Sequence, residues 1–276
     1  MMQSAVERWQ EMIDARARQM DAAYARLGRT SADYWSRRAH GYHRSTRETV
    51  ASDPFYLKLR TVVTSETTVL DVGAGTGRFA LALAPQAKQV IAVEPNESML
   101  SFLQDDAREQ GISNISYSQT KWEDTPDDVR ADIAICSHVV YPIRDIVPFL
   151  EKLNASAKRA CYVYVRVTPI DTLTAPIWRH FHGDDRHMSP GAIHLLDVLY
   201  EMGIYADVEI ARLPASLRFP SLDVAAQELT EQLMLRDDPQ TRDELRGLLS
   251  NWLVPRDGML APPVKEMAVA ILNWQV

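Results

Sequence analysis

The chain has 276 residues, of which 46% are hydrophobic, and its 30 Lys and Arg against 37 Asp and Glu give a formal net charge of −7. This length suits one large α/β domain with additions, and the acidic balance gives no general attraction to a nucleic-acid backbone, so a nucleic-acid partner is disfavoured. The charged N-terminus does not resemble a signal peptide, and no apolar run is long enough to span a membrane. Cys136 and Cys161 lie in apolar runs typical of buried thiols. We therefore expect a cytoplasmic protein without membrane contact.

Helical patterns fill the N-terminal part of the chain. Apolar side chains recur there at helical spacing, and Asp53-Pro54 marks a break. We expect helices at residues 3–27, 31–50 and 55–63. The segment 1–54 is accordingly interpreted as an N-terminal helical cap on a main domain at 55–276.

Short apolar runs then alternate with longer amphipathic segments. This alternation predicts a parallel sheet with helices on its faces. The expected strands are 67–71, 89–94, 114–118, 131–136 and 160–167, and the expected helices are 77–84, 96–110 and 144–154.

The pattern changes after residue 170. Three prolines or glycines and three histidines predict that residues 170–190 form a loop with at most one helical turn. Ser189 is the expected N-cap of the next helix, with Pro190 at its first position. The remaining expected elements are a helix at 189–203, a strand at 204–213, helices at 221–235 and 239–252, and a last strand at 265–275.

A glycine-rich turn follows the first expected core strand. Residues 69–80 read Val-Leu-Asp-Val-Gly-Ala-Gly-Thr-Gly-Arg-Phe-Ala, so an apolar run leads into Asp71, three alternating glycines and a helical segment. Glycine lets a backbone turn tightly and approach a nucleotide-like ligand closely. The dinucleotide fingerprint G-x-G-x-x-G requires glycine where Arg78 stands, which disfavours a nicotinamide cofactor.

A second signal lies about 20 residues further on. The run Val90-Ile-Ala-Val is typical of a buried parallel strand and ends in Glu94. A carboxylate at that strand end can accept hydrogen bonds from both hydroxyls of a ribose.

The pattern D-x-G-x-G-x-G, followed by this acid, resembles motif I and its neighbour in the class I S-adenosylmethionine (SAM) dependent methyltransferases. The resemblance implies a Rossmann-like, doubly wound sheet of seven strands ordered 3-2-1-4-5-7-6, with strand 7 antiparallel. The helices at 221–252 would then be an insertion between the last two strands and would form a lid together with the N-terminal helices.

The resemblance also implies a set of cofactor contacts. The backbone at Gly73, Ala74, Gly75 and Gly77 would face the methionine part of SAM. Asp71 would hold its ammonium group, Glu94 would bind the ribose, and Pro95 and Met99 would pack on the adenine. Ser137, at the end of the strand at 131–136, would pass under the sulfonium.

Residues 120–126 occupy the place of a family motif that reads the adenine amino group. Lys121 stands where relatives often have Asp, and a lysine cannot accept a hydrogen bond. Adenine contact in this loop would therefore fall to Trp122 and Glu123, although Trp122 could instead cover the sheet.

Methyl transfer needs alignment of the nucleophile and exclusion of water, and a base is optional. His138 follows the fourth strand and is the candidate base, because imidazole titrates near neutrality. It could alternatively cap the next helix or bind the cofactor carboxylate. Tyr141 on the same rim and Tyr42 in the N-terminal region are the other candidate catalytic residues.

The loop at 170–190 also contains His182, Asp184, Asp185 and His187. These are metal-ligand types, but they lack helical His-x-x-x-His spacing and a Cys pair, so we expect no metal site. Three arginines could anchor an acceptor carboxylate, and the sequence does not choose between them: Arg166, Arg179 and Arg218.

The sequence therefore predicts a methyltransferase that uses SAM, forms S-adenosylhomocysteine and acts on a small molecule, as a monomer or a homodimer. Two alternatives remain open. One is a SAM-binding regulatory or partner protein without transferase activity. The other is an enzyme acting on RNA or protein, which a basic stripe at Arg37, Arg38, Arg44 and Arg47 favours. The chain lacks the Asn/Asp-Pro-Pro-Tyr motif of amino-methylating DNA and protein enzymes.

Overall fold

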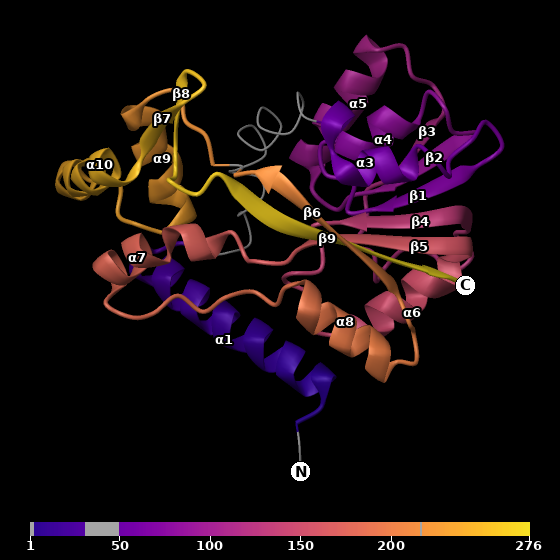
Figure 1. Cartoon of the computed structure of the whole chain (residues 1–276), viewed down its shortest axis with the longest axis horizontal. Coiled ribbons are helices and arrows are strands. Elements are labelled where there is room, and N and C mark those ends of the chain that lie inside the picture. The colour runs from indigo at the N-terminus through magenta and orange to yellow at the C-terminus, as the bar shows by residue number, and fades with distance from the viewer. Residues whose placement is uncertain (1–2, 31–49, 216) are drawn as a thin grey trace.

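The computed structural model describes residues 3–30, 50–215 and 217–276. A seven-stranded sheet lies at its centre, in the order β3-β2-β1-β4-β5-β9-β6 (Figure 1). The strands are β1 (Thr68–Val72), β2 (Gln89–Val93), β3 (Ile115–Ser118), β4 (Ala131–Ser137), β5 (Ala157–Arg166), β6 (Asp207–Pro214) and β9 (Glu266–Gln275). Strands β1 to β5 pair in parallel, and β9 runs antiparallel to both β5 and β6. This confirms the predicted order, with β9 as the seventh strand.

Helices cover both faces of the sheet (Figure 1). Helices α3 (Pro54–Leu59), α4 (Arg78–Leu83) and α5 (Glu97–Glu109) pack on one face, whereas α6 (Ile146–Ser156) and α8 (Ala192–Glu201) pack on the other. The central strands are buried on both sides, which explains their continuous apolar runs.

A helical lobe lies beyond the carboxyl ends of the parallel strands (Figure 1). It contains α7 (Asp171–His182), α9 (Leu222–Gln232), α10 (Pro239–Trp252) and the hairpin of β7 (Val254–Arg256) and β8 (Met259–Ala261). Its apolar side chains form a cluster of their own around Trp178, Leu229 and Leu245. All of these elements except α7 lie between β6 and β9 in the chain.

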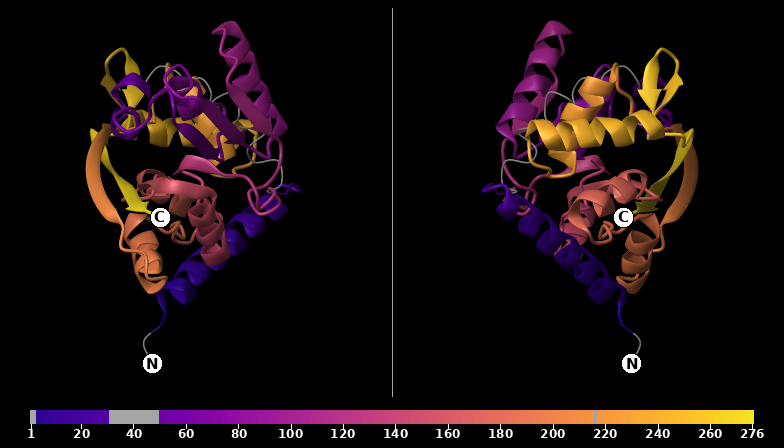
Figure 2. Two further views of the ribbon diagram at one scale, coloured as in Figure 1. Left: turned by 90° about the vertical axis from the view of Figure 1, so that its right-hand side faces the viewer. Right: turned by 90° about the vertical axis from the view of Figure 1, so that its left-hand side faces the viewer.

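Helix α1 (Ala5–Arg26) joins the lobe to the sheet. Its first half buries Trp9 and Ile13 in the core under the sheet, and its second half buries Ala23 and Tyr24 in the lobe. In Figure 1 it runs from beside α8 to beside α7, and Figure 2 shows it crossing the molecule obliquely. The Trp9 indole N–H donates to the carbonyl of Ile143 at 2.7 Å.

The predicted loop at 170–190 is wrong over most of its length, because Asp171–His182 is a helix. Pro176 lies inside this helix, where it removes one backbone hydrogen bond. Burial of Ile177 and Trp178 in the lobe offsets that cost. Gly183, in the left-handed conformation with φ 82°, ends the helix.

The predicted start of the next helix is also wrong. Helix α8 begins at Ala192 rather than at Pro190, and Gly191 occupies the cap position in an extended conformation. The Gly191 N–H donates to Nδ1 of His194 at 3.1 Å, and a Cβ at Gly191 would lie 2.8 Å from the carbonyl oxygen of Val167. Close approach to the end of β5 therefore fixes this start, and Ser189 does not act as the cap.

Most of the predicted helix at 31–50 lies outside the described residues, and Val50–Ser52 is a short 3-10 helix. Within the described ranges, no helix is long and apolar enough to cross a membrane.

Replacement of Trp9 by alanine tests whether α1 is part of the main core. We expect Trp9→Ala to lower the free energy of unfolding by about 3–5 kcal/mol, because it leaves a cavity and an unpaired Ile143 carbonyl. Chemical denaturation measures this loss, with Glu11→Ala on the exposed side of the same helix as the control. Equal stability of the two variants would contradict the packing of α1 described above.

Candidate functional site

Three glycines turn the chain between β1 and α4. Gly73, Gly75 and Gly77 have φ values of 73°, 57° and 85°, a region that side chains rarely allow. A Cβ at Gly73 would lie 2.3 Å from Cγ2 of Val139, so the loop packs directly against the segment after β4. The loop therefore requires glycine both for its turn and for its contact.

The parallel register brings the ends of three strands to the same edge of the sheet. Val72 pairs with Val93 of β2 and with Cys136 of β4. The residues that follow these positions, Glu94 and Ser137, therefore flank the glycine loop on its two sides. This is the edge at which open α/β sheets bind ligands.

The Glu94 carboxylate is fixed by backbone groups. It accepts hydrogen bonds from the N–H of Gly75 at 2.9 Å and of Asn96 at 2.8 Å, one on each oxygen. Each oxygen retains a second lone-pair direction, so the carboxylate can still accept from a ligand hydroxyl. Pro95 is exposed beside it, while Met99 is 4% exposed and packs at the start of α5.

Asp71 is a second buried carboxyl group next to the same loop and is 2% exposed. Burial and, to a smaller extent, the negative charge of Glu94 raise its pKa to about 7, against the opposing effect of the hydrogen bond from the N–H of Ala80. Burial also raises the pKa of Glu94, although its two backbone hydrogen bonds act in the opposite direction. A cationic ligand beside these two carboxyl groups would favour their charged forms and so lower both pKa values.

His138 and Tyr141 follow the end of β4 and contact each other. His138 has φ 59°, and its N–H donates to the carbonyl of Tyr164 at 2.8 Å. Its Nδ1 lies 2.9 Å from the hydroxyl of Tyr141, which also accepts a hydrogen bond from the N–H of Arg166 at 2.8 Å. The phenol thus ties the histidine ring to the end of β5, and Nε2 is the ring nitrogen left for a ligand.

The His138 ring retains some accessible surface, but protein atoms surround it closely. This burial, followed by the positive charges of Arg166 and Arg78, holds the pKa of His138 well below its usual range. The imidazole is therefore neutral at physiological pH.

His138 packs against a cluster of aromatic and charged residues that the sequence analysis did not predict. The Tyr164 ring lies 4.9 Å from the His138 ring and stacks on Phe55 at 4.7 Å. Asp53 caps α3 by accepting from the N–H of Phe55, and it pairs with Arg78 at 2.7 Å. The signals that could have identified the pair are the Asp53-Pro54 helix start and Arg78 in place of the third glycine of the G-x-G-x-x-G fingerprint.

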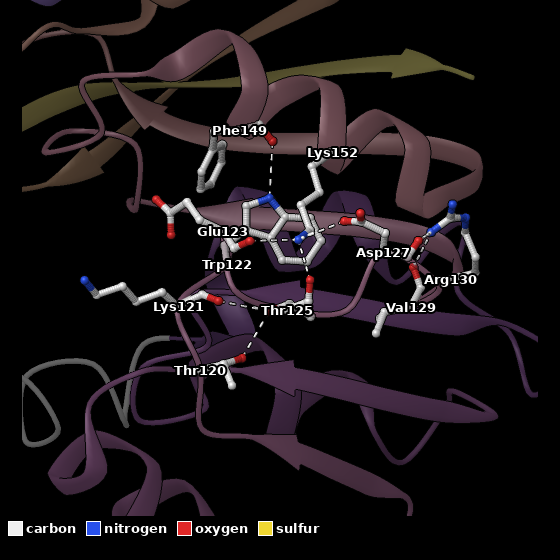
Figure 3. A network of polar contacts seen from close by, with 10 residues as sticks. All are labelled: Thr120, Lys121, Trp122, Glu123, Thr125, Asp127, Val129, Arg130, Phe149 and Lys152. Atoms are coloured by element: carbon white, nitrogen blue, oxygen red, sulfur yellow. Dashed lines mark hydrogen bonds and ion pairs between the residues drawn. The ribbon is translucent and has the colours of Figure 1, made fainter.

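The loop that contains Trp122 and Glu123 is held by Lys152 of α6 (Figure 3). The Lys152 ammonium donates to the carbonyls of Glu123 and Thr125, pairs with Asp127 at 3.2 Å and lies 5.3 Å from the centre of the Trp122 ring. The Trp122 indole donates to the carbonyl of Phe149 at 3.2 Å and is 4% exposed. The indole therefore packs under α6, and a ligand would meet this loop through its backbone and the exposed Glu123.

The structure thus brings most of the predicted site residues to one edge of the sheet: Asp71, Gly73, Ala74, Gly75, Gly77, Glu94, Pro95, Ser137, His138 and Tyr141. Tyr42 and the basic stripe at Arg37, Arg38, Arg44 and Arg47 lie outside the described residues.

The polar segment after α7 has a structural role. Gln19 of α1 donates to Asp184 at 3.0 Å and to the carbonyl of Asp185 at 2.8 Å, and Trp178 donates to Asp184 at 3.2 Å. The His182 ring stacks on Trp178 at 3.8 Å. No group of three or more His, Cys, Asp or Glu in the described parts of the chain is arranged to hold a metal ion.

Comparison with known proteins agrees with this geometry. Residues 69–159 match the family model of a methyltransferase domain. An uncharacterized protein of Haemophilus influenzae is 31% identical over 147 residues, which is 53% of this chain and 54% of that protein. The uncharacterized methyltransferase YcgJ of Bacillus subtilis is 32% identical over 83 residues, or 30% of this chain and 33% of that protein. The chain thus spans about half or less of these relatives.

The fold also matches solved structures. A proposed methyltransferase from Bacillus halodurans C-125 superposes with a TM-score of 0.54 and 16% sequence identity, over 81% of this chain and 98% of that one. The matched domain contains the glycine loop, both acids and the segment with His138, and the sheet order is that of the class I fold. The similarity to methyltransferases is thus shown for residues 69–159, which contain these site residues.

The raised pKa of Asp71 predicts a pH-dependent cost to stability. Its folded-state pKa of about 7 exceeds the ordinary aspartate value of 3.8, so the folded state binds this proton more tightly than the unfolded state, and stability falls as pH rises through 7. We expect Asp71→Asn to remove this loss, so that between pH 4 and 8 the variant gains on the order of 4 kcal/mol relative to the wild type.

Urea denaturation across this pH range measures the difference. Asp124→Asn, at an exposed position, is the control for the same chemical change. Parallel pH profiles for the wild type and Asp71→Asn would contradict the assigned pKa.

Proposed function

We propose that the chain transfers the methyl group of SAM to a small-molecule acceptor by direct displacement and releases S-adenosylhomocysteine. The observation that supports this most directly is the Glu94 carboxylate, held on the glycine loop by the N–H of Gly75 at 2.9 Å. This contact places a hydrogen-bond acceptor beside the glycine loop, at the edge where open α/β sheets bind ligands.

Chain residues on the cofactor side would bind and orient. Glu94 would accept from the two ribose hydroxyls, Asp71 would face the ammonium group, and the backbone of residues 73–77 would line the methionine part. SAM supplies a methyl group already activated on a sulfonium. The residues therefore need to fix its position and exclude water rather than to activate it.

On the acceptor side, His138 is the proposed base and Tyr141 its positioning residue. The Tyr141 oxygen, which already accepts from the N–H of Arg166, can accept a second hydrogen bond from a proton on Nδ1 of His138. This assignment leaves Nε2 unprotonated, and a neutral imidazole can then accept the proton of a hydroxyl or amine acceptor.

The lobe is the proposed wall of the acceptor side. Its helices α9 and α10 lie beyond the carboxyl ends of the strands, where an acceptor would meet the methyl group (Figure 1). In this proposal residues 1–54 and 221–252 act together as a cap on the main domain. The buried free thiols of Cys136 and Cys161 suit a reducing compartment, so we place the enzyme in the cytoplasm.

Calorimetric titration with SAM and with S-adenosylhomocysteine tests the cofactor site. We expect both to bind in the micromolar range. Glu94→Gln keeps the shape of the side chain but removes the charge that strengthens its hydrogen bonds, so we expect affinity to fall at least about 10-fold.

Glu97→Gln makes the same chemical change at an exposed position three residues away and controls for net charge. Absence of binding by folded wild-type protein would overturn the proposed function. Tight binding without methyl transfer to any small molecule would instead favour a regulatory SAM-binding protein, and affinity for RNA that falls with salt would favour a nucleic-acid substrate.

A further inference from the structure

We propose that β6 and α8 form the interface of a homodimer, in which the two β6 strands pair antiparallel about a twofold axis. The proposal does not rest on the proposed function, because β6 is the end strand of the sheet, four positions away from β1 and its glycine loop. The exposed side chains that carry the proposal are called the edge surface below: Ile193, Tyr200, Tyr205, Val208 and Ile210.

The edge surface holds the most exposed large apolar side chains of the described residues. Tyr205 is 75% exposed, Tyr200 68%, Ile210 60% and Ile193 58%, whereas the next value is 48% at Val276. One exposed apolar side chain is ordinary on a protein surface, but a group of them marks an interaction site.

Helix α8 contributes one side of the edge surface. Ile193 and Tyr200 are seven residues apart, so both lie on the same side of the helix, away from the core. A surface helix usually carries polar residues on that side. The Tyr200 ring meets the Tyr205 ring at 5.4 Å, edge to face, and Tyr205 stands just before β6. The two tyrosines therefore connect the helix to the strand.

Strand β6 contributes the other side. Val208 pairs with Leu272 of β9, and Ile210 pairs with Ala270. Leu272 and Ala270 pack in the same core as the buried residues of α8. Since paired residues project from the same face of a sheet, Val208 and Ile210 lie on the face that α8 covers. In both views of Figure 2, β6 and α8 (orange) lie at the same margin of the molecule.

The backbone of β6 offers a free edge. Among the described residues, β9 alone pairs with it in the sheet. β6 has eight residues in continuous register with β9, and its proline, Pro214, comes at its last position. β3, at the opposite edge, has four residues. Natural sheets often prevent edge pairing by short strands, bulges or an internal proline, and β6 has none of these.

The charges of β6 favour a second copy in antiparallel orientation. Glu209 already pairs with Lys58 of α3. Asp207 lies in the first half of the strand and Arg212 in the second half. Antiparallel pairing brings the first half of each strand beside the second half of the other, so the opposite charges approach each other. Parallel pairing would instead bring like charges together.

The size of the edge surface matches one side of a dimer interface. The exposed parts of its five residues amount to on the order of 700 Å², with the two tyrosines as the largest contributors. A stable interface buries about 800 Å² on each partner. A twofold axis places the same groups of both chains opposite each other, so one surface serves both partners.

Sedimentation velocity on the full chain tests the dimer. We expect a dimer whose fraction rises with protein concentration between about 1 and 100 μM. Val208→Lys/Ile210→Lys places like charges at the axis and should raise the dissociation constant at least about 100-fold. Val254→Lys/Val264→Lys is the matched control, because these valines are 38% and 40% exposed outside the edge surface, and it should stay dimeric.

Oxidative cross-linking tests the pairing of the strands and does not require a variant that weakens the dimer. Ile210 lies in the middle of β6, so in antiparallel pairing it faces its own copy or a position close to it. Both natural cysteines, Cys136 and Cys161, are buried. Mild oxidation of Ile210→Cys should therefore yield a disulfide-linked dimer, whereas Val254→Cys should remain unlinked.

Four outcomes would overturn the proposal. The first is a wild type that stays monomeric over the whole concentration range. The second is a dimer that persists in Val208→Lys/Ile210→Lys with an unchanged circular dichroism spectrum, which places the interface elsewhere. The third is a dimer that Ile210→Cys does not cross-link. The fourth is a monomer that binds phosphatidylcholine vesicles through the edge surface, which assigns this surface to a membrane.

Discussion

The hydrogen bond from the N–H of Gly75 to Glu94 is the contact on which the site depends. It joins the loop after β1 to the end of β2, at 2.9 Å, and so makes two separate segments of the chain one surface. The same carboxylate also accepts from the N–H of Asn96, whose side chain caps α5. One buried acid thereby fixes the positions of the loop, the strand end and the start of the next helix. Its burial is tolerated because these hydrogen bonds compensate for the loss of water around the carboxylate.

The part of the site around His138 is organised around a different element. Tyr164 of β5 contacts Phe55 and Phe79 through its ring and lies beside His138. Aromatic rings packed in this way have little rotational freedom, so the histidine is supported by a rigid wall. The two sides meet at Gly73, where a single absent side chain lets the segment after β4 touch the glycine loop.

The fold was largely predictable because buried parallel strands appear in the sequence as short, continuous apolar runs. Runs such as Val90–Val93 are buried on both faces, and each ends in a polar residue where the site begins. The glycine loop and Glu94 could be predicted because their spacing is short and local. Helix α7 could not, since its proline and glycine favour a loop and only the packing of Trp178 against a lobe distant in sequence stabilises it.

The same distinction applies within the site. His138 and Tyr141 could be predicted from their place after a strand, but the Asp53–Arg78 pair joins residues 25 apart in the chain and follows from tertiary structure. The packing of Trp122 under α6 likewise depends on Lys152, which no local pattern connects to it. Local motifs therefore predicted groups that lie at the carboxyl edge of the sheet, and long-range contacts determined the groups that hold them.

Helix α1 takes part in both apolar cores, and this limits how the molecule can open. Its 22 residues form one continuous helix that is buried against the sheet at Trp9 and against the lobe at Tyr24. A swing of the lobe away from the sheet would have to bend this helix or expose one of its ends to water. Because this helix keeps its length, small rearrangements of the strand-end loops would let a ligand reach the edge of the sheet more readily than a hinge motion of the lobe.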